Sequence, residues 1–196
     1  MTGKDIIKVT LNLVIVYLIG GLILAFVFAK ASPKIYKNNE EAEKKALKEL
    51  MPEADESIKL GDWSIHDKHA KYFVSKKGGD TIGYIIQSFG KGYSSYINTF
   101  VAVDKDFRVQ KINILAHGET PGLGDEIELD YFKDRLKGKD IEHLKVLKTE
   151  TKEYVEAISG ATISSRAVTE DAVKNGVAFL IKTVKEGGNT DVQQQH

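Results

Sequence analysis

An uncharged apolar run near the amino terminus restricts what this chain can fold into. Between Lys8 and Lys30 lie 21 residues, VTLNLVIVYLIGGLILAFVFA, that carry no charged side chain. As an α-helix this run is about 30 Å long, which matches the hydrocarbon core of a bilayer. A helix that is apolar on every side is foreign to the surface of a small soluble domain. The run therefore predicts a single transmembrane anchor within residues 1–30.

A secretory signal peptide is the alternative interpretation of the same run. The sequence Ala29-Lys30-Ala31 resembles a cleavage site, but the apolar run is longer than the about 7–15 residues of a signal's hydrophobic region. We therefore expect a retained anchor. Lysines flank it at positions 4 and 8 before the run and at 30, 34 and 37 after it, and this count favours a cytoplasmic position for the rest of the chain.

Composition excludes several classes of function. The 196 residues are 42% hydrophobic and 29% charged, the formal net charge is zero, and there is no cysteine. Balanced charge gives no indication of a nucleic-acid partner. The lack of cysteine excludes thiolate-held iron–sulfur clusters, zinc–thiolate sites, disulfides and cysteine nucleophiles in this chain.

The pattern after the anchor predicts one α+β domain of antiparallel strands flanked by helices. We expect residues 31–60 to form a connector, with a solvated stalk helix from about Glu40 to Met51. Alternating residues from Trp63 onward then predict two or three strands with a turn at Gly78-Gly79. A further strand pair is expected across a turn at Asp104–Asp106.

The C-terminal part of the chain reads as mainly helical. A short helix is expected around Tyr131–Lys137, and a longer one follows residue 165 and ends at Gly187-Gly188. Apolar residues recur at helical spacing along the longer helix, which predicts one buried face: Val168, Ala172, Val177, Leu180, Ile181 and Val184. The domain is therefore expected to cover residues 61–187, with a flexible tail at 188–196.

Histidines give little indication of a metal site. His66 and His69 would lie on opposite faces of an alternating strand, so we expect no metal there. His143 and His196 are expected at the surface. The Ser and His residues form no recognisable nucleophile elbow or triad, and we expect no catalytic residue of that kind.

The most informative stretch of the domain is SGATISS, Ser159 to Ser165, which precedes the long helix. Gly160 permits backbone conformations that a side chain would forbid, and small neighbours let a ligand approach the main chain. At a helix start the first N–H groups lack partners and the dipole favours an anion. Thr162 and its neighbouring serines add hydroxyl groups. The stretch predicts either a phosphate site or an ordinary capped helix start.

A turn-rich loop, HGETPGLGD, runs from His117 to Asp125. Pro121 with Gly122 favours a tight turn, and Gly124 allows another. The loop directly follows a predicted strand, so we expect it at an edge of the sheet. It matches neither a Walker A loop nor the GxGxxG fingerprint, which argues against nucleotide binding of those two types.

Together, and behind a single anchor, the two motifs resemble those of a known family of flavoproteins. The family comprises RnfG, the FMN-binding subunit of the Rnf electron-transport complex, and NqrC, its relative in the sodium-pumping NADH:quinone reductase. Its S/T-G-A-T sequence matches Ser159–Thr162, and its ETPGLG loop matches Glu119–Gly124. The resemblance implies FMN bound covalently, as a phosphoester on Thr162, with the loop against the flavin.

The residues implied at the FMN site are Thr162, which would carry FMN, with Ser159, Gly160, Ala161, Ile163, Ser164, Ser165, His117, Glu119, Thr120, Pro121, Gly122, Leu123 and Gly124. Gly90, Gly92 and Tyr93 are further candidates, although a glycine-rich strand connection explains them equally well. The family's flavin transferase usually recognises Asp six residues before the threonine, where this chain has Glu156. Glutamate keeps the charge on an arm one methylene longer, and we expect modification to be retained.

The resemblance also implies a function. The chain would be a redox subunit that is not catalytic alone, in a membrane complex that couples ferredoxin:NAD⁺ electron transfer to movement of Na⁺ or H⁺. Its partners would be the other Rnf subunits, including RnfD, the second subunit with covalent FMN, together with the flavin transferase and membrane lipid. The family places the domain on the extracytoplasmic side, and we follow it over the lysine count.

Three alternatives stay open at this point. One is the NqrC subunit of the sodium-pumping NADH:quinone reductase, although the short part after the anchor, residues 31–196, favours the Rnf subunit. The others are an anchored non-redox binding or scaffold module and a stand-alone extracytoplasmic flavin reductase.

Overall fold

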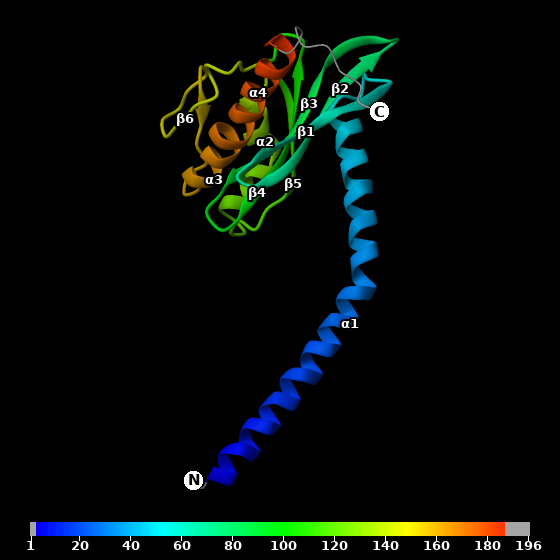
Figure 1. Cartoon of the computed structure of the whole chain (residues 1–196). Coiled ribbons are helices and arrows are strands. Elements are labelled where there is room, and N and C mark those ends of the chain that lie inside the picture. Colours follow the sequence, from blue (N-terminus) through cyan, green and yellow to red (C-terminus); the bar gives the residue numbers. More distant parts are fainter. Residues whose placement is uncertain (1–2, 187–196) are drawn as a thin grey trace. The chain divides into compact units, whose positions relative to one another are not determined.

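The computed structural model describes residues 3–186, and the chain divides into two compact units, Met1–Glu43 and Lys44–His196. The amino-terminal unit is helical. Helix α1 runs from Gly3 to Leu50 as one element (Figure 1). It contains a stretch long and apolar enough to cross a membrane, and no part of that stretch is buried.

The predicted break before Glu40 is wrong, because α1 continues through that region with Pro33 in its interior. An interior proline removes its own N–H and crowds one carbonyl, which bends a helix but does not have to end it. The predicted end is confirmed within one residue, since α1 stops at Leu50, just before Pro52.

The last turn of α1 is not the solvated stalk that its charges predicted. Ala46 and Leu50 are buried, as is Met51 just after the helix. Leu50 and Met51 form an apolar cluster with Phe73 and Phe100 of the sheet. The apolar residues at positions 46, 47 and 50 share one helix face, a signal that the surrounding charges obscure.

Five antiparallel strands form a meander in sequence order. Their bounds are β1 Glu56–Ile65, β2 Lys68–Lys77, β3 Asp80–Lys91, β4 Tyr96–Asp104 and β5 Val109–Ala116. The predicted turns at Gly78-Gly79 and after Asp104 join β2 to β3 and β4 to β5. The α+β prediction is confirmed, and the sheet begins at Glu56, inside the stretch expected as connector.

The turn between β1 and β2 was not predicted. His66 and Asp67 form it with φ angles of 51° and 57°, in the left-handed region. Non-glycine residues are uncommon in this region, and the turn contains neither glycine nor proline to mark it in the sequence. The expectation that His66 and His69 share a strand is wrong: His66 lies in the turn with its Nε2 2.8 Å from Oδ1 of Asp171, and His69 is exposed in β2.

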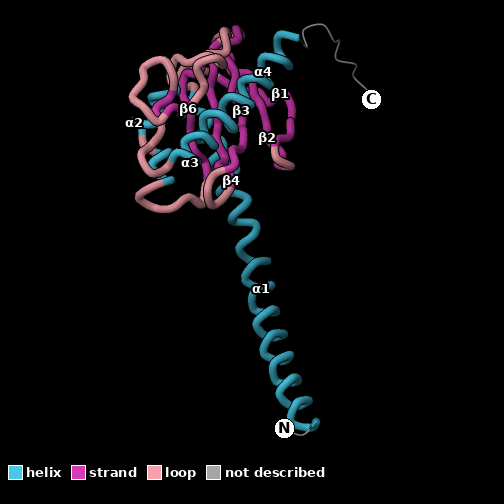
Figure 2. Tube along the Cα trace, turned by 90° about the vertical axis from the view of Figure 1, so that its left-hand side faces the viewer, coloured by secondary structure: helices cyan, strands magenta, loops and turns pink. Residues whose placement is uncertain are grey.

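The C-terminal helix runs across one face of the sheet (Figure 2). Its successive segments are α3 Thr162–Arg166, the π-helical η3 Ala167–Val173, α4 Lys174–Leu180 and the π-helical η4 Ile181–Glu186. The predicted buried face is confirmed, because Val168, Ala172, Val177 and Leu180 are fully buried while Ile181 and Val184 pack at the margin. The predicted end at 187–188 and the tail lie outside the described residues.

Close packing of this helix against the sheet explains Gly90, one of the two glycines in the sequence GKGY at residues 90–93. A Cβ on Gly90 of β3 would lie 1.8 Å from the carbonyl oxygen of Ala167. Only glycine lets the helix backbone approach the strand to this distance. Gly90 therefore serves the contact between helix and sheet and lies outside the lining of the pocket described below.

Short elements connect β5 to the C-terminal helix. They are η1 Gly124–Glu128, α2 Asp130–Lys133, η2 Asp134–Leu136, β6 Val146–Leu147 and β7 Val155–Glu156. α2 and η2 confirm the predicted short helix. The parallel pair of β6 and β7 was not predicted, and it places Glu156 beside Leu147. Fully buried Phe132, Leu136 and Leu144 anchor this layer to the main core.

Candidate functional site

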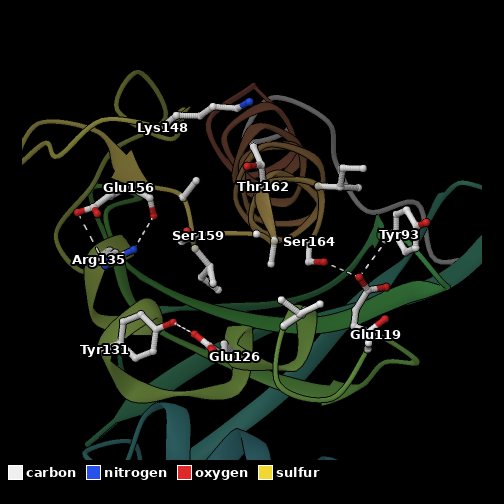
Figure 3. Close-up of a pocket in the computed structure, with 18 residues that line it drawn as sticks. Tyr93, Glu119, Glu126, Tyr131, Arg135, Lys148, Glu156, Ser159, Thr162 and Ser164 are labelled. Atoms are coloured by element: carbon white, nitrogen blue, oxygen red, sulfur yellow. Dashed lines mark hydrogen bonds and ion pairs between the residues drawn. The ribbon is translucent and has the colours of Figure 1, made fainter.

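A pocket with a volume of about 970 Å³ lies where the C-terminal helix begins (Figure 3). Its wall is formed by the loop after β5, by η1, α2 and η2, and by the segment from β7 to α3. The lining consists of Tyr93, Glu119, Thr120, Leu123, Gly124, Glu126, Tyr131, Arg135, Lys148 and residues 156–164. A volume at the upper end of the usual 300–1,000 Å³ range suits a cofactor-sized ligand.

The SGAT sequence forms the sharp entry into the helix. Gly160 has a φ of +78°, and a Cβ there would lie 3.2 Å from Cδ2 of Leu123. Thr162 is the first residue of α3 and lines the pocket. The first N–H groups of a helix have no intrahelical acceptor, and the helix dipole makes this end attractive to an anion. The Thr162 hydroxyl therefore lies where a phosphate would be stabilised.

Ser165 holds this entry from behind. Its hydroxyl donates to the Ala161 carbonyl at 2.9 Å and accepts from the Ile158 N–H at 3.0 Å. Ser165 is fully buried and lies outside the pocket lining. The sequence placed it among the FMN contacts, but the structure gives it the role of fixing the backbone that leads to Thr162.

Glu119 is a buried carboxylate, 5% exposed, beneath the same entry. Its oxygens accept hydrogen bonds from the Ser164 hydroxyl and from the N–H groups of Tyr93, Ser94 and Ser95, the last three at 3.1, 3.0 and 3.4 Å. The carboxylate thus joins the β3–β4 connection, the loop after β5 and the first turn of α3.

These hydrogen bonds also control the charge of Glu119. Burial alone would raise its pKa, but the donors from Ser164, Ser94, Tyr93 and Ser95 together outweigh burial and hold the pKa below its ordinary value. The carboxylate is therefore ionised at neutral pH. It acts as a fixed acceptor rather than as a proton donor.

The opposite wall carries a second polar group of residues. Arg135 Nη1 donates to the Glu156 carbonyl oxygen at 2.8 Å, and its Nη2 lies 3.8 Å from Oε2 of the Glu156 side chain. The guanidinium also lies over the Tyr131 ring, 5.2 Å from its centroid. Tyr131 donates its hydroxyl hydrogen to Glu126. Burial and this bond to Glu126 raise the pKa of Tyr131 to about 12.

The structure brings most of the predicted site residues together. Residues 159–164 line the pocket with Glu119, Thr120, Leu123 and Gly124. Pro121, Gly122 and His117 lie outside the lining. His117 instead accepts the Glu119 N–H at Nδ1, at 3.1 Å, and its Nε2 lies 2.9 Å from Oε1 of Glu128. It braces the loop that carries Glu119.

Sequence reasoning missed one side of the pocket. Glu126, Tyr131, Arg135, Lys148, Ala157 and Ile158 line it without belonging to either motif. Tyr93 was a secondary candidate and does line it. A cation and an aromatic residue four positions apart on a short helix, at 135 and 131, were the available signal, since such pairs share a helix face.

Within residues 3–186 no group of three or more His, Asp or Glu side chains is arranged for a metal ion.

The chain is similar to several proteins of known name. Residues 92–178 match the FMN-binding domain family. Over 178 residues the chain is 34% identical to the G subunit of the proton-translocating ferredoxin:NAD⁺ oxidoreductase complex of Clostridium ljungdahlii, a match that covers 89% of this chain and 91% of the relative. Over 183 residues it is 28% identical to the G subunit of the ion-translocating oxidoreductase complex of Methanosarcina acetivorans, covering 91% and 96%.

The fold also resembles a solved structure. The crystal structure of the C subunit of the Na⁺-translocating NADH-quinone reductase from Parabacteroides distasonis superposes with a TM-score of 0.59 at 24% identity, covering 83% of this chain and 97% of that one. This likeness confirms the expected α+β fold of the domain.

Proposed function

The chain belongs to the family of G subunits of ion-translocating oxidoreductase complexes, and we propose that it carries FMN as a phosphoester on the Thr162 hydroxyl. One observation carries the proposal: Thr162 opens a helix at the wall of a cofactor-sized pocket. The helix start stabilises a phosphate, and the covalent bond would keep the flavin from diluting into solvent.

The residues around Thr162 fit the phosphate. Gly160 places no side chain over the helix entry, and the exposed Ser159 adds a hydroxyl donor. Lys148 lines the same pocket and, in Figure 3, lies above Thr162. The Lys148 ammonium and the free N–H groups at the start of α3 form a suitable environment for a phosphate diester. Ala161 and Ile163 beside them carry no charge that would oppose the phosphate.

The remaining lining fits a planar ring system. Leu123 and Ile163 offer apolar surface, and Tyr93 and Tyr131 offer aromatic surface. Bound FMN would supply one- and two-electron transfer, while the protein binds and orients it and tunes its electrostatic surroundings. No group of the chain is required as a general acid or base for this role.

In this proposal the chain is the electron-transfer subunit of a complex that couples ferredoxin:NAD⁺ oxidoreduction to transport of Na⁺ or H⁺. Helix α1 anchors it as a single pass in the cytoplasmic membrane, with the domain on the extracytoplasmic side. Its partners are the other subunits of the complex, among them RnfD with its own covalent FMN, and a flavin transferase attaches the FMN. The names of the Clostridium and Methanosarcina relatives support the assignment to such a complex.

A denaturing gel viewed under ultraviolet light before staining tests the proposal. The protein is produced in a host with an active flavin transferase, beside the variants Thr162→Val and Thr120→Val. Thr120 also lines the pocket but lies outside the SGAT sequence, so it is the matched control. We expect fluorescence from the wild type and from Thr120→Val at the position of the 21.8 kDa chain. Thr162→Val should be dark.

A dark wild-type band, with the transferase active on a control substrate, would contradict covalent attachment. It would shift support to non-covalent FMN or to an anchored binding module. Fluorescence that persists in Thr162→Val would place the flavin on another hydroxyl.

A further inference from the structure

The charges that line the pocket are unequal in how firmly they are held. The described lining contains three carboxylates, Glu119, Glu126 and Glu156, and two cations, Arg135 and Lys148. Glu119 is fully engaged by the donors described above. Lys148 is exposed, so solvent screens its charge and its side chain has rotamer freedom.

Arg135, in contrast, is fixed in place. Its side chain is 27% exposed and is held by contacts from two directions. The Glu156 carbonyl and carboxylate bind the two terminal nitrogens, and the Tyr131 ring lies against the guanidinium plane. η2 supplies Arg135, α2 supplies Tyr131, and β7 supplies Glu156, so three elements determine the position of one charge (Figure 3).

The charges of this wall do not cancel. Glu126 and Glu156 contribute two negative charges against the one positive charge of Arg135. Tyr131, whose pKa is raised to about 12, stays a neutral donor to Glu126. The wall therefore carries a net negative charge, and Arg135 is the group that keeps it from being more negative.

We infer that Arg135 raises the reduction potential of the flavin held in this pocket, because it places a fixed positive charge in a wall that is otherwise acidic. This inference rests on the proposed function. Electrons that arrive on a flavin bring negative charge, and a pre-positioned cation in a partly dehydrated site stabilises that charge without reorganisation. At an effective dielectric constant of about 20, a unit charge still acts over several ångströms.

Two substitutions with opposite charge effects test the inference. Arg135→Gln removes the cation but keeps an N–H donor for the Glu156 carbonyl. Glu126→Gln removes a carboxylate from the same wall and keeps an acceptor for Tyr131. Arg135→Lys retains the charge. Arg108→Gln is the charge-matched control, because Arg108 is 53% exposed at its side chain and lies outside the lining.

The full-length protein with each substitution is purified in detergent, checked for in-gel flavin fluorescence, and titrated electrochemically while the flavin absorbance is followed. We expect Arg135→Gln to favour the oxidised flavin by about tenfold at a fixed potential, a fall of about 30 mV for a two-electron couple. Glu126→Gln should change the potential in the opposite direction. Arg135→Lys should stay nearer the wild type than Arg135→Gln, and Arg108→Gln should match the wild type.

The outcomes separate the inference from the function on which it rests. Flavin-loaded Arg135→Gln with the wild-type potential would overturn the role of Arg135 while leaving the flavoprotein assignment intact. Shifts of the same sign in Arg135→Gln and Glu126→Gln would also overturn it. If Arg135→Gln yields no loaded protein, Glu126→Gln decides. A raised potential in that variant supports the inference, and an unchanged or lowered potential would overturn it. A wild type without flavin would contradict both the function and the inference.

Discussion

The carboxylate of Glu119 accepts a hydrogen bond from the hydroxyl of Ser164, and this bond joins segments 45 residues apart in the chain. The same carboxylate receives the N–H groups of residues 93–95. One buried charge thus fastens the ETPGLG loop and the β3–β4 connection to the first turn of the helix that Thr162 opens. The two sequence motifs are parts of one hydrogen-bonded structure.

Removing that carboxylate should destabilise the domain. Glu119→Ala leaves three backbone N–H groups and the buried Ser164 hydroxyl without their acceptor. We expect a loss of roughly 1.5–3 kcal/mol in the free energy of unfolding, the range for hydrogen bonds to charged groups. Urea unfolding in detergent measures it. Glu53→Ala, at an exposed glutamate, is the control and should change stability little; an equal loss in both variants would contradict the role of Glu119.

The lowered pKa of Glu119 predicts how stability depends on pH. The ordinary value is 4.5, and the folded value lies below it, so the folded state stabilises the ionised form. This contribution is fully present above pH 4.5 and is lost as the pH falls through the lowered pKa. In Glu119→Gln the group does not titrate. The stability difference between wild type and Glu119→Gln should therefore shrink as the pH drops below 4.5, and a difference that stays constant down to about pH 3 would be inconsistent with the hydrogen-bond pattern.

Gly160 offers a test that separates folding from cofactor attachment. Its φ of +78° is unfavourable for a residue with a Cβ, and the Cβ would also press on Leu123. Gly160→Ala should cost about 1–2 kcal/mol and reduce flavin loading, because the entry to Thr162 must shift. Gly138→Ala is the matched control, since Gly138 has a φ of +77° and open space around its Cβ position. It should lose similar stability yet load flavin normally; equal loading in both variants would contradict the importance of this entry.

Membrane association should depend on the amino-terminal part of α1. Its apolar side chains are exposed, for example Leu24 at 71% and Phe28 at 68%, a surface that water does not favour. The full chain should sediment with membranes and resist carbonate extraction, whereas a chain that lacks residues 1–30 should be recovered in the soluble fraction. Fractionation followed by immunoblotting measures this. Membrane retention of the shortened chain would show that the domain itself holds the lipid or a partner.

Local patterns predicted the elements that repeat. The alternation in β2–β5, the glycine turn at 78–79 and the stripe of buried residues in the C-terminal helix all extend over several residues, so each was visible in the sequence. The two motifs gave Thr162 and Glu119 through their resemblance to a known family. The parallel pair of β6 and β7 has only two residues in each strand and therefore no period to detect.

Features fixed by distant contacts were not predictable. The turn at His66 depends on a left-handed backbone in non-glycine residues, and a hydrogen bond to Asp171 holds it from 105 positions away. The charges near the end of α1 concealed the apolar face that packs on the sheet. Arg135 meets Glu156 only because the layer of short elements folds back on the main core.

Peptide mass spectrometry of the purified protein shows whether the Thr162 hydroxyl carries FMN. Trypsin cleaves after Lys152 and Arg166, which releases the peptide EYVEAISGATISSR with Thr162 and three serines. We expect this peptide with the added mass of FMN less one water, and fragmentation should assign the addition to Thr162 rather than to a serine. An unmodified peptide from protein made with an active transferase, or a modification on Ser159, Ser164 or Ser165, would contradict it.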